Sequence, residues 1–238
     1  MVVIPWVSYQ VIRQVEIQEA WQTLNRIEGK EYSPTRDQAL EKLSKLGEEL
    51  GKANLKEVTF GNISLIGVNL SDANLHSVNL SNANLSDAKL SDATLSKSYL
   101  ISTNLSDANL NNSQLIGTNL SDANLSNAKL LNAFLMSAIL RDTDLSNANL
   151  SNTNLYNAIL YDANLDGAKL INAQQLTSQQ IKSACYWEKA YYKGDFDREK
   201  YEWIIDKQDN QKYIEELKAD KTSDPEDPVD CSKWNFFK

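Results

Sequence analysis

Glycine, proline and histidine are scarce in this sequence, and it has no long apolar run. Its 238 residues include only 8 glycines, 4 prolines and 1 histidine, which argues against a chain made mostly of loops. No stretch approaches the roughly 20 apolar residues needed to span a bilayer. The apolar start, residues 1–9, has neither a basic lead-in nor a small-residue cleavage site, so it is not typical of a signal peptide. We therefore expect a cytoplasmic protein with no membrane span.

Basic residues are too few for a nucleic-acid-binding surface. The chain has 24 lysines and arginines against 32 aspartates and glutamates, a formal net charge of −8. Because phosphate binding needs a basic surface, direct binding to nucleic acid is not expected. The acidic surplus instead favours a partner whose own surface is basic.

Residue patterns that carry catalysis or bind metals are also missing. His76, the single histidine, lies at an outward position of a repeat, and a catalytic base would also need a nucleophile and an orienting partner. Glycine-rich phosphate loops, HExxH motifs and closely spaced cysteine pairs do not occur. We therefore expect no enzyme, with no catalytic, cofactor-binding or metal site. The two cysteines, Cys185 and Cys231, would be free thiols in a reducing compartment or a disulfide in an oxidising one, and the sequence leaves both open.

A five-residue period dominates the middle of the chain. From Leu55 to Leu170 a large apolar residue returns at every fifth position, 24 times in succession, and a small or β-branched residue usually lies two positions before it. Neither the 3.6-residue period of a helix nor the two-residue period of a strand fits this spacing. A backbone that turns a corner about every five residues would point every leucine to one axis. The period therefore predicts a solenoid.

The repeated units, such as Leu70-Ser-Asp-Ala-Asn and Leu120-Ser-Asp-Ala-Asn, follow the pattern A-[DN]-L-x-x. This pattern resembles the pentapeptide-repeat family, which is abundant in cyanobacteria. The resemblance implies an all-β solenoid, a right-handed quadrilateral β-helix with 20 residues per coil, and hence about six coils here. Within each repeat, the Asp or Asn after the serine suits a corner, where its side chain could accept a backbone N–H.

Short helical segments flank the repeats. Residues 1–52 are predicted to form an N-terminal helical cap, with an apolar stripe on Ile17, Ala20, Trp21, Leu24 and Ile27 and a second helix starting at Ser33-Pro34. The β-helix then covers 53–175. Residues 176–238 are predicted to form a helical, aromatic-rich extension. It begins with a capping box at Thr177–Gln180, on a helix that carries Ile181, Ala184 and Cys185, and a further helix carries Tyr213, Ile214 and Leu217.

Three aspartates would stack directly if each coil has 20 residues: Asp122, Asp142 and Asp162. Such a column could hold a hard cation such as Ca²⁺. We favour the simpler interpretation that each carboxylate accepts the N–H of its own corner while water screens the repulsion.

The same 20-residue alignment predicts an apolar patch on two adjoining faces of the last three coils. Its members flank two columns of leucines, and we call them the apolar patch: Tyr99, Ile101, Ile116, Phe134, Met136, Ile139, Tyr156, Ile159 and Tyr161. Large exposed apolar patches on soluble proteins usually mark interactions. Either the C-terminal extension folds back over this patch, or a partner protein or a second copy of the chain binds there.

These features favour a non-catalytic scaffold that presents a rigid solenoid surface to an unidentified protein partner. The alternative comes from the family resemblance, since some members mimic duplex DNA and inhibit the type II topoisomerase gyrase. Residues 54–173 carry ten acidic and six basic residues, which is a low charge for a mimic of a duplex with one charge per roughly 1.7 Å. If residues upstream of Met1 were missing, the periplasm or the thylakoid lumen would also be open as compartments.

Overall fold

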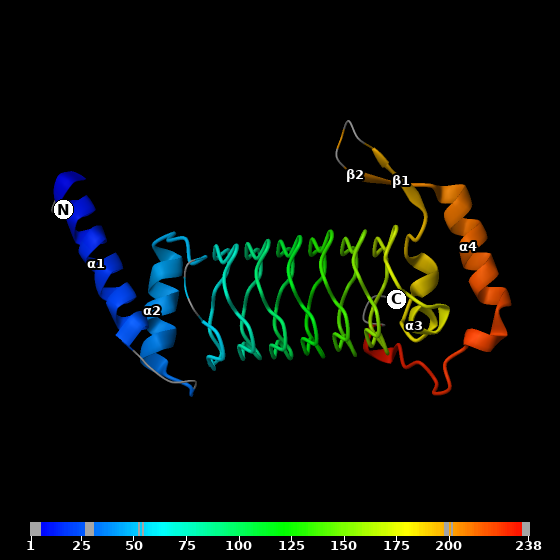
Figure 1. Ribbon diagram of the computed structural model, residues 1–238, viewed down its shortest axis with the longest axis horizontal. Coiled ribbons are helices and arrows are strands. Elements are labelled where there is room, and N and C mark those ends of the chain that lie inside the picture. The colour runs from blue at the N-terminus through cyan, green and yellow to red at the C-terminus, as the bar shows by residue number, and fades with distance from the viewer. Residues whose placement is uncertain are drawn as a thin grey trace.

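The structure is a computed structural model, and it describes residues 6–26, 31–51, 53, 55–197, 200 and 202–234. Figure 1 shows a rod of stacked coils with helices at both ends. In chain order the elements are α1 (Trp6–Arg26), α2 (Pro34–Lys45), α3 (Ser178–Lys182), η1 (Trp187–Lys189), β1 (Gly194–Asp197), β2 (Glu202–Ile205), α4 (Lys207–Ala219), η2 (Lys221–Ser223) and η3 (Ser232–Trp234).

The rod is held together by parallel bridges between residues 20 positions apart. The series of bridges runs from Glu49↔Asn69 to Asn154↔Gln174, and the bridged residues lie one position before the leucines. Backbone hydrogen bonds connect the same levels; for example, the N–H of Leu110 donates to the C=O of Lys129 at 2.7 Å. Each coil therefore consists of four five-residue sides, and each coil pairs its backbone with the coils above and below it.

Apart from the corner at residues 60–63, the described corners of the regular coils are four-residue turns with one residue in the left-handed region. In the turn from Leu105 to Ala108, the N–H of Ala108 donates to the C=O of Leu105 at 3.1 Å. Asp107, the third residue of this turn, has a φ of 60°. A turn with positive φ at its third position favours Gly, Asn and Asp. This preference explains why these residues predominate two positions after the leucines.

The side chain that accepts the corner N–H is not the one expected from the sequence. Asn104, which lies before Leu105, accepts the N–H of Ser106 through its Oδ1 at 3.1 Å, and Asn124 accepts that of Ser126 at 2.9 Å. An Asx side chain reaches the N–H two residues further along the chain, so the residue before the leucine is the acceptor. The Asp or Asn after the serine instead supplies the left-handed backbone.

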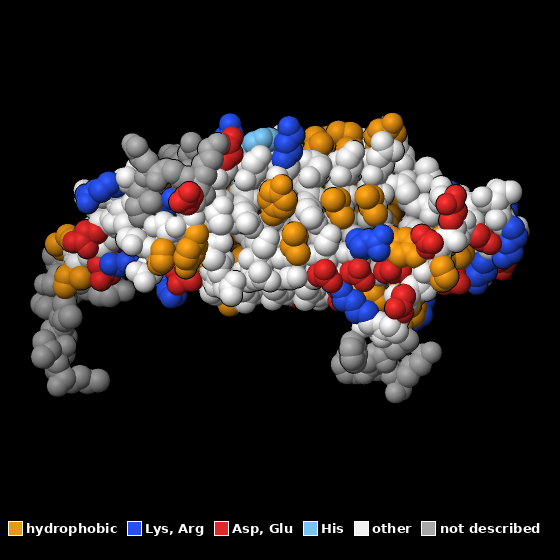
Figure 2. Space-filling view, turned by 90° about the horizontal axis from the view of Figure 1, so that it is seen from below, with side chains coloured by type: hydrophobic (Ala, Val, Ile, Leu, Met, Phe, Trp, Pro, Cys, Tyr) orange, Lys and Arg blue, Asp and Glu red, His pale blue; other side chains and the backbone are white. Residues whose placement is uncertain are grey.

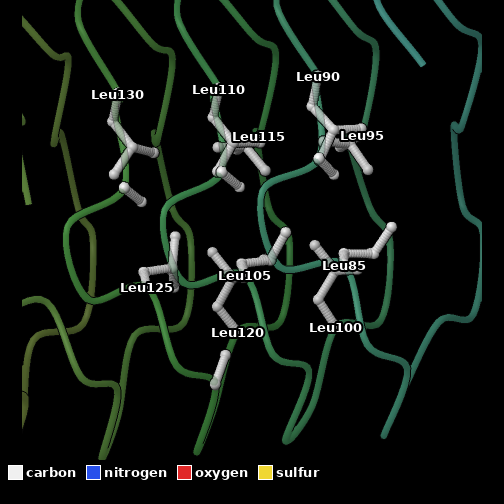
Figure 3. Packing of buried hydrophobic residues seen from close by; sticks show 14 of the residues in the cluster. Leu85, Leu90, Leu95, Leu100, Leu105, Leu110, Leu115, Leu120, Leu125 and Leu130 are labelled. Atoms are coloured by element: carbon white, nitrogen blue, oxygen red, sulfur yellow. The ribbon is translucent and has the colours of Figure 1, made fainter. Parts of the chain in front are cut away.

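The core is a stack of leucines along the axis of the rod. Every leucine of the column from Leu65 to Leu170 is at most 2% exposed. Figure 3 shows Leu90, Leu110 and Leu130 in one row from coil to coil. Where a hydroxyl residue replaces the inward alanine, it bonds within the core; Thr103 Oγ1 donates to the C=O of Leu80 at 2.9 Å. The interior is therefore apolar, and most of its hydroxyl groups donate to backbone carbonyls, either of another coil, as Thr103 does, or of the same coil, as Ser113 Oγ does to the C=O of Leu110 at 2.7 Å.

Helix α2 covers the open end of the first coil. Its N-terminus matches the sequence-based prediction: the side chain of Ser33 accepts the N–H of Arg36, and proline stands at the first helical position. Two carboxylates of α2 then accept N–H groups of the solenoid, Asp37 Oδ2 from Gly61 at 2.9 Å and Glu41 Oε1 from Ser64 at 3.0 Å. These bonds satisfy a coil edge that would otherwise be free to pair with another chain.

Helix α1 packs beside α2 at this end (Figure 1) and buries Ile17, Ala20 and Leu24. Ile27, which was expected to complete the apolar stripe, lies outside the described residues, as does the start of the apolar segment at 1–5. Within the described part of the chain, no helix is long and apolar enough to cross a membrane.

The C-terminal end continues the coil in altered form. Thr177 and Gln180 make the predicted capping box of α3, but this helix ends at Lys182 and does not carry Ala184 and Cys185 as expected. The helix cannot continue beyond Lys182 because Cys185 forms a parallel bridge with Asn164 of the preceding coil. Their separation of 21 residues reflects the shift in register that follows the last regular repeat.

A strand pair and a longer helix follow in the C-terminal extension. Strands β1 and β2 form an antiparallel pair that the sequence analysis did not predict. Helix α4 was predicted on Tyr213, Ile214 and Leu217, and it begins at the N-cap Asp206, whose side chain accepts the N–H of Asp209. Ile214 and Leu217 are buried, which fixes α4 on the end of the rod.

Candidate protein-interaction surface

The bridges place the apolar patch on two adjoining sides of the coils. Phe134 bridges Gln114 below it and Asn154 above it, and Ile139 bridges Ile159. The N–H of Ser137 donates to the C=O of Tyr156, which sets the corner of Met136 beneath that of Tyr156. The columns inferred from the repeat therefore coincide with the observed register. Figure 2 shows hydrophobic side chains gathered in rows along the solenoid.

Four members of the apolar patch are strongly exposed. The exposed fractions are 52% for Tyr99, 44% for Phe134, 50% for Tyr156 and 46% for Ile159. The remaining members are half-buried: Ile101, Ile116, Met136, Ile139 and Tyr161. Tyr161 is the one patch residue that forms a hydrogen bond with the described part of the C-terminal extension. With four members about half exposed, the patch is largely open.

Tyr161 differs from the rest of the patch because it lies in a seam with the C-terminal extension. Its hydroxyl donates to the C=O of Pro228 at 2.6 Å, and the guanidinium of Arg141 lies 4.5 Å from the centre of its ring. Desolvation, with a smaller contribution from the charge of Asp162, raises the pKa of Tyr161. The extension thus touches one edge of the patch and leaves its centre uncovered.

The C-terminal segment covers the neighbouring corner, where the aspartates stack. Lys233 Nζ lies 2.7 Å from Asp122 Oδ1 and donates to the C=O of Asp142 at 3.0 Å. Asp162 Oδ1 accepts the N–H of Asp230 at 2.7 Å. Burial raises the pKa of Asp162, and the hydrogen bond from Asp230 opposes that shift.

Both sequence-based interpretations of this column therefore need correction. Asp122 and Asp142 share the single ammonium group of Lys233, whose Nζ lies 2.7 Å and 3.9 Å from their Oδ1 atoms, and Asp162 accepts the N–H of Asp230. The main partner of each aspartate is therefore a residue of the C-terminal segment rather than the N–H of its own corner. Among the described residues, no group of three or more His, Cys, Asp or Glu side chains is arranged to hold a metal ion.

Cys185 and Cys231 are joined by a disulfide in the structure. This bond links the C-terminal segment to the last bridged level of the solenoid, next to the acidic column. The sequence pattern does not identify Lys233 as the partner of that column, because 111 residues separate it from Asp122. The sequence offers one indication of this contact: Lys233 lies two residues after Cys231, and a disulfide between Cys231 and Cys185 places the residues near Cys231 at this corner.

His76 makes no arrangement that resembles a catalytic site. Its backbone N–H donates to Asn74 Oδ1 at 3.2 Å, and its C=O accepts the N–H of Glu57 at 2.8 Å. Both contacts belong to the ordinary corner and ladder bonds of the solenoid. The expectation that the chain is not an enzyme stays a prediction.

Solved structures similar to this chain are repeat proteins of one type. Rfr23, a pentapeptide repeat protein from the cyanobacterium Cyanothece 51142, is 44% identical over 37% of this chain and 60% of that chain, with a TM-score of 0.37. HetL, from the cyanobacterium Nostoc sp. strain PCC 7120 and involved in heterocyst differentiation regulation, is 34% identical over 50% of this chain and 63% of that chain, with a TM-score of 0.27. QnrB1, a plasmid-mediated fluoroquinolone resistance protein, is 16% identical over 68% and 88% of the two chains, with a TM-score of 0.28. This chain thus covers less than two thirds of the length of Rfr23 and of HetL.

No curated protein matches the chain. The family model of pentapeptide repeats matches in 8 copies, over residues 53–92, 88–127, 103–142, 118–155 and 138–174. Apart from Glu49, these segments cover the residues that the 20-residue bridges join. The chain belongs to the pentapeptide repeat family, whose members form right-handed quadrilateral β-helices.

Proposed function

We propose that this chain is a non-catalytic protein-interaction module and that a protein partner binds its apolar patch. The observation that carries the proposal is the exposure of Tyr99, Phe134, Tyr156 and Ile159, each about half accessible on adjoining faces of one rod. Tyrosine and other aromatic side chains are enriched among residues that dominate binding energy. Exposed apolar residues of this size, gathered on a solenoid whose other outward positions are mostly polar, favour a partner contact.

The regular backbone supports the same function. The backbone that carries the patch is fixed by ladder bonds on both sides, such as Phe134 N–H to the C=O of Ser113 in one neighbouring coil and Leu135 N–H to the C=O of Asn154 in the other. A surface that is already ordered loses little conformational entropy when it binds. The partner would therefore meet a preformed surface.

The finer architecture follows from the repeat length. Twenty-four repeats at four per coil give about six coils, and a strand spacing of about 4.8 Å makes a rod roughly 25–30 Å long. We infer an N-terminal cap at 1–52, the β-helix at 53–175 and the extension at 176–238. The patch then lies on the coils next to the extension, at the end of the rod opposite to α1 and α2.

A DNA-mimic inhibitor of gyrase fits the structure less well. A mimic needs an acidic surface that stays free, whereas Asp122 is paired with Lys233 at 2.7 Å and Asp162 accepts the N–H of Asp230. Unchanged supercoiling by gyrase at micromolar concentrations of this protein would exclude that role.

The direct test is an affinity pull-down from native lysate with wild type and two double variants. Phe134→Glu with Met136→Lys changes the patch, while Lys129→Glu with Leu131→Lys changes the matching positions on a neighbouring side of the same coil. The proposal predicts a partner that wild type and the control retain and that the patch variant loses. Equal retention by both variants, with circular dichroism showing both to be folded, would contradict it.

A second copy of the chain could be the occupant of the patch. Sedimentation of the purified proteins distinguishes this case: a dimer in wild type and control that becomes a monomer in the patch variant would identify the partner as the same chain. A monomer in all three samples leaves a different protein as the partner.

A further inference from the structure

The last described segment of the chain, residues 225–234, contributes nothing to the buried core. We call this segment the tail. None of its ten residues is buried, in contrast to the neighbouring helix α4, where Ile214 and Leu217 are at most 4% exposed. The tail lies along the outside of the last coils, close to the solenoid corner (Figure 1).

Apart from the disulfide, polar contacts hold the tail in place. The C=O of Pro228 accepts the hydroxyl of Tyr161 at 2.6 Å, and the N–H of Asp230 donates to Asp162 at 2.7 Å. Lys233 Nζ donates to Asp122 Oδ1 at 2.7 Å and to the C=O of Asp142 at 3.0 Å. The indole Nε1 of Trp234 donates to the C=O of Asp162 at 2.9 Å. A hydrogen bond contributes less net stability than ordering a residue or two of backbone costs. These contacts alone are therefore too few to order ten residues.

The segment just before the tail is anchored independently. Lys182, only 4% exposed, donates to the C=O of Asp220 and to Asp224 Oδ1, the latter at 2.9 Å. This ion pair lowers the pKa of Asp224. Because Asp224 is fixed here and α4 is held by its buried face, movement of the tail would begin at Pro225 and leave the rest of the extension in place.

We propose that the tail is a redox-controlled strap, held over the acidic column by the disulfide and released when the disulfide is reduced. The disulfide joins the tail at Cys231 to Cys185 in the last bridged level of the solenoid. Without this covalent bond, the entropy gained by ten residues outweighs the polar contacts. The strap is a property of this chain that does not depend on the identity of a partner.

The chemistry is a thiol–disulfide exchange with a dithiol reductant. Cys231 is partly exposed and Cys185 is 1% exposed, so the reductant's thiolate attacks the sulfur of Cys231 and the thiolate of Cys185 leaves. The second thiol of the reductant then displaces Cys231. Two electrons and two protons pass to the protein, which gains two thiols, and the reductant becomes a disulfide.

Release changes the surface beside the apolar patch. Asp122 and Asp142 lose the ammonium group of Lys233, and Tyr161 loses its bond to Pro228. The corner then presents free carboxylates next to an apolar surface, which favours a basic binding segment. In the oxidised protein the tail covers this corner.

Hydrogen exchange read by mass spectrometry tests the strap on the full-length protein. Dithiothreitol is added until alkylation finds two free thiols, and exchange is followed in peptides from the tail and from residues 85–115. We expect tail amides, including that of Asp230, to exchange roughly tenfold faster or more after reduction, and coil amides to change less than about twofold. Cys231→Ser without reductant is expected to match reduced wild type, and reoxidation with oxidised glutathione should restore slow exchange.

Lys233→Ala with the disulfide intact is the matched control, and its tail is expected to exchange less than about threefold faster than wild type. The strap is refuted if tail exchange is unchanged after complete reduction, because the polar contacts then suffice. It is equally refuted if reduction accelerates exchange throughout residues 85–115, since the disulfide would then hold the solenoid itself. Two free thiols in the untreated protein would also refute it.

Discussion

Replacing Leu110 by alanine is expected to lower the free energy of unfolding by about 3 kcal/mol, within the range of large-to-small core substitutions. Leu110 is 0% exposed and lies between Leu90 and Leu130 in the axial stack (Figure 3). Its neighbours are fixed by ladder bonds to the coils above and below, such as Leu110 N–H to the C=O of Lys129. The coils therefore cannot close over the cavity that the alanine leaves. The loss in free energy of unfolding then includes a contribution from this cavity as well as from the burial that the side chain loses.

Leu131→Ala is the matched control for this prediction. Leu131 is also a leucine and lies on the coil next to that of Leu110. It is at a corner, outside the axial stack, and its side chain is half-buried. Its replacement is expected to cost about 1 kcal/mol or less. Guanidinium unfolding is best followed by far-ultraviolet circular dichroism, because all five tryptophans lie outside residues 53–175 and report on the flanks. A loss below about 1 kcal/mol for Leu110→Ala, or equal losses for the two variants, would refute a close-packed axial core.

Three further changes test other parts of the structure. Ser151 is fully buried, and its hydroxyl has no hydrogen-bond partner among the described residues; Ser151→Ala is therefore expected to raise stability by about 1 kcal/mol in chemical denaturation. Burial raises the pKa of Asp37 above its ordinary value of 3.8. The stability that the protonated carboxyl contributes is therefore full below pH 3.8 and is lost as the pH rises through the raised pKa. Asp37→Asn should remove this pH-dependent loss of stability, which is measured by unfolding wild type and variant at about pH 4 and pH 7. Hydrogen bonds from Thr222 and Ser223 lower the pKa of Asp220 to about 2. The stability that the ionised carboxylate contributes above pH 3.8 is therefore lost as the pH falls through about 2. Asp220→Ala should abolish this loss in an acid titration of folding.

The solenoid could be predicted from the leucine period, and its columns could be predicted because the family resemblance implies a coil of 20 residues. A residue that returns every five positions must face one axis, and the 20-residue coil then decides which side chains share a face. The bridges Gln114↔Phe134 and Ile139↔Ile159 follow this rule. The start of α2 at Ser33-Pro34 was likewise predictable, because N-capping depends on local residue types.

The C-terminal extension was less predictable because its structure depends on distant contacts. Helix α3 ends at Lys182 since Cys185 returns to pair with Asn164, which no local pattern shows. The bonds from Tyr161 to Pro228 and from Lys233 to Asp122 join residues 67 and 111 positions apart. The strands β1 and β2 have four residues each, too short to show a clear alternation of apolar and polar residues.

Whether the partner contacts the apolar patch can be measured most directly by photo-crosslinking. A benzoylphenylalanine residue replaces Phe134 in one variant and Lys129, on a neighbouring side of the same coil, in the other. Both proteins are irradiated in native lysate and resolved by denaturing electrophoresis. We predict a discrete adduct from position 134 and none from position 129. An adduct from position 129 alone, or no adduct from position 134 while tagged wild type still retains a partner, would contradict it.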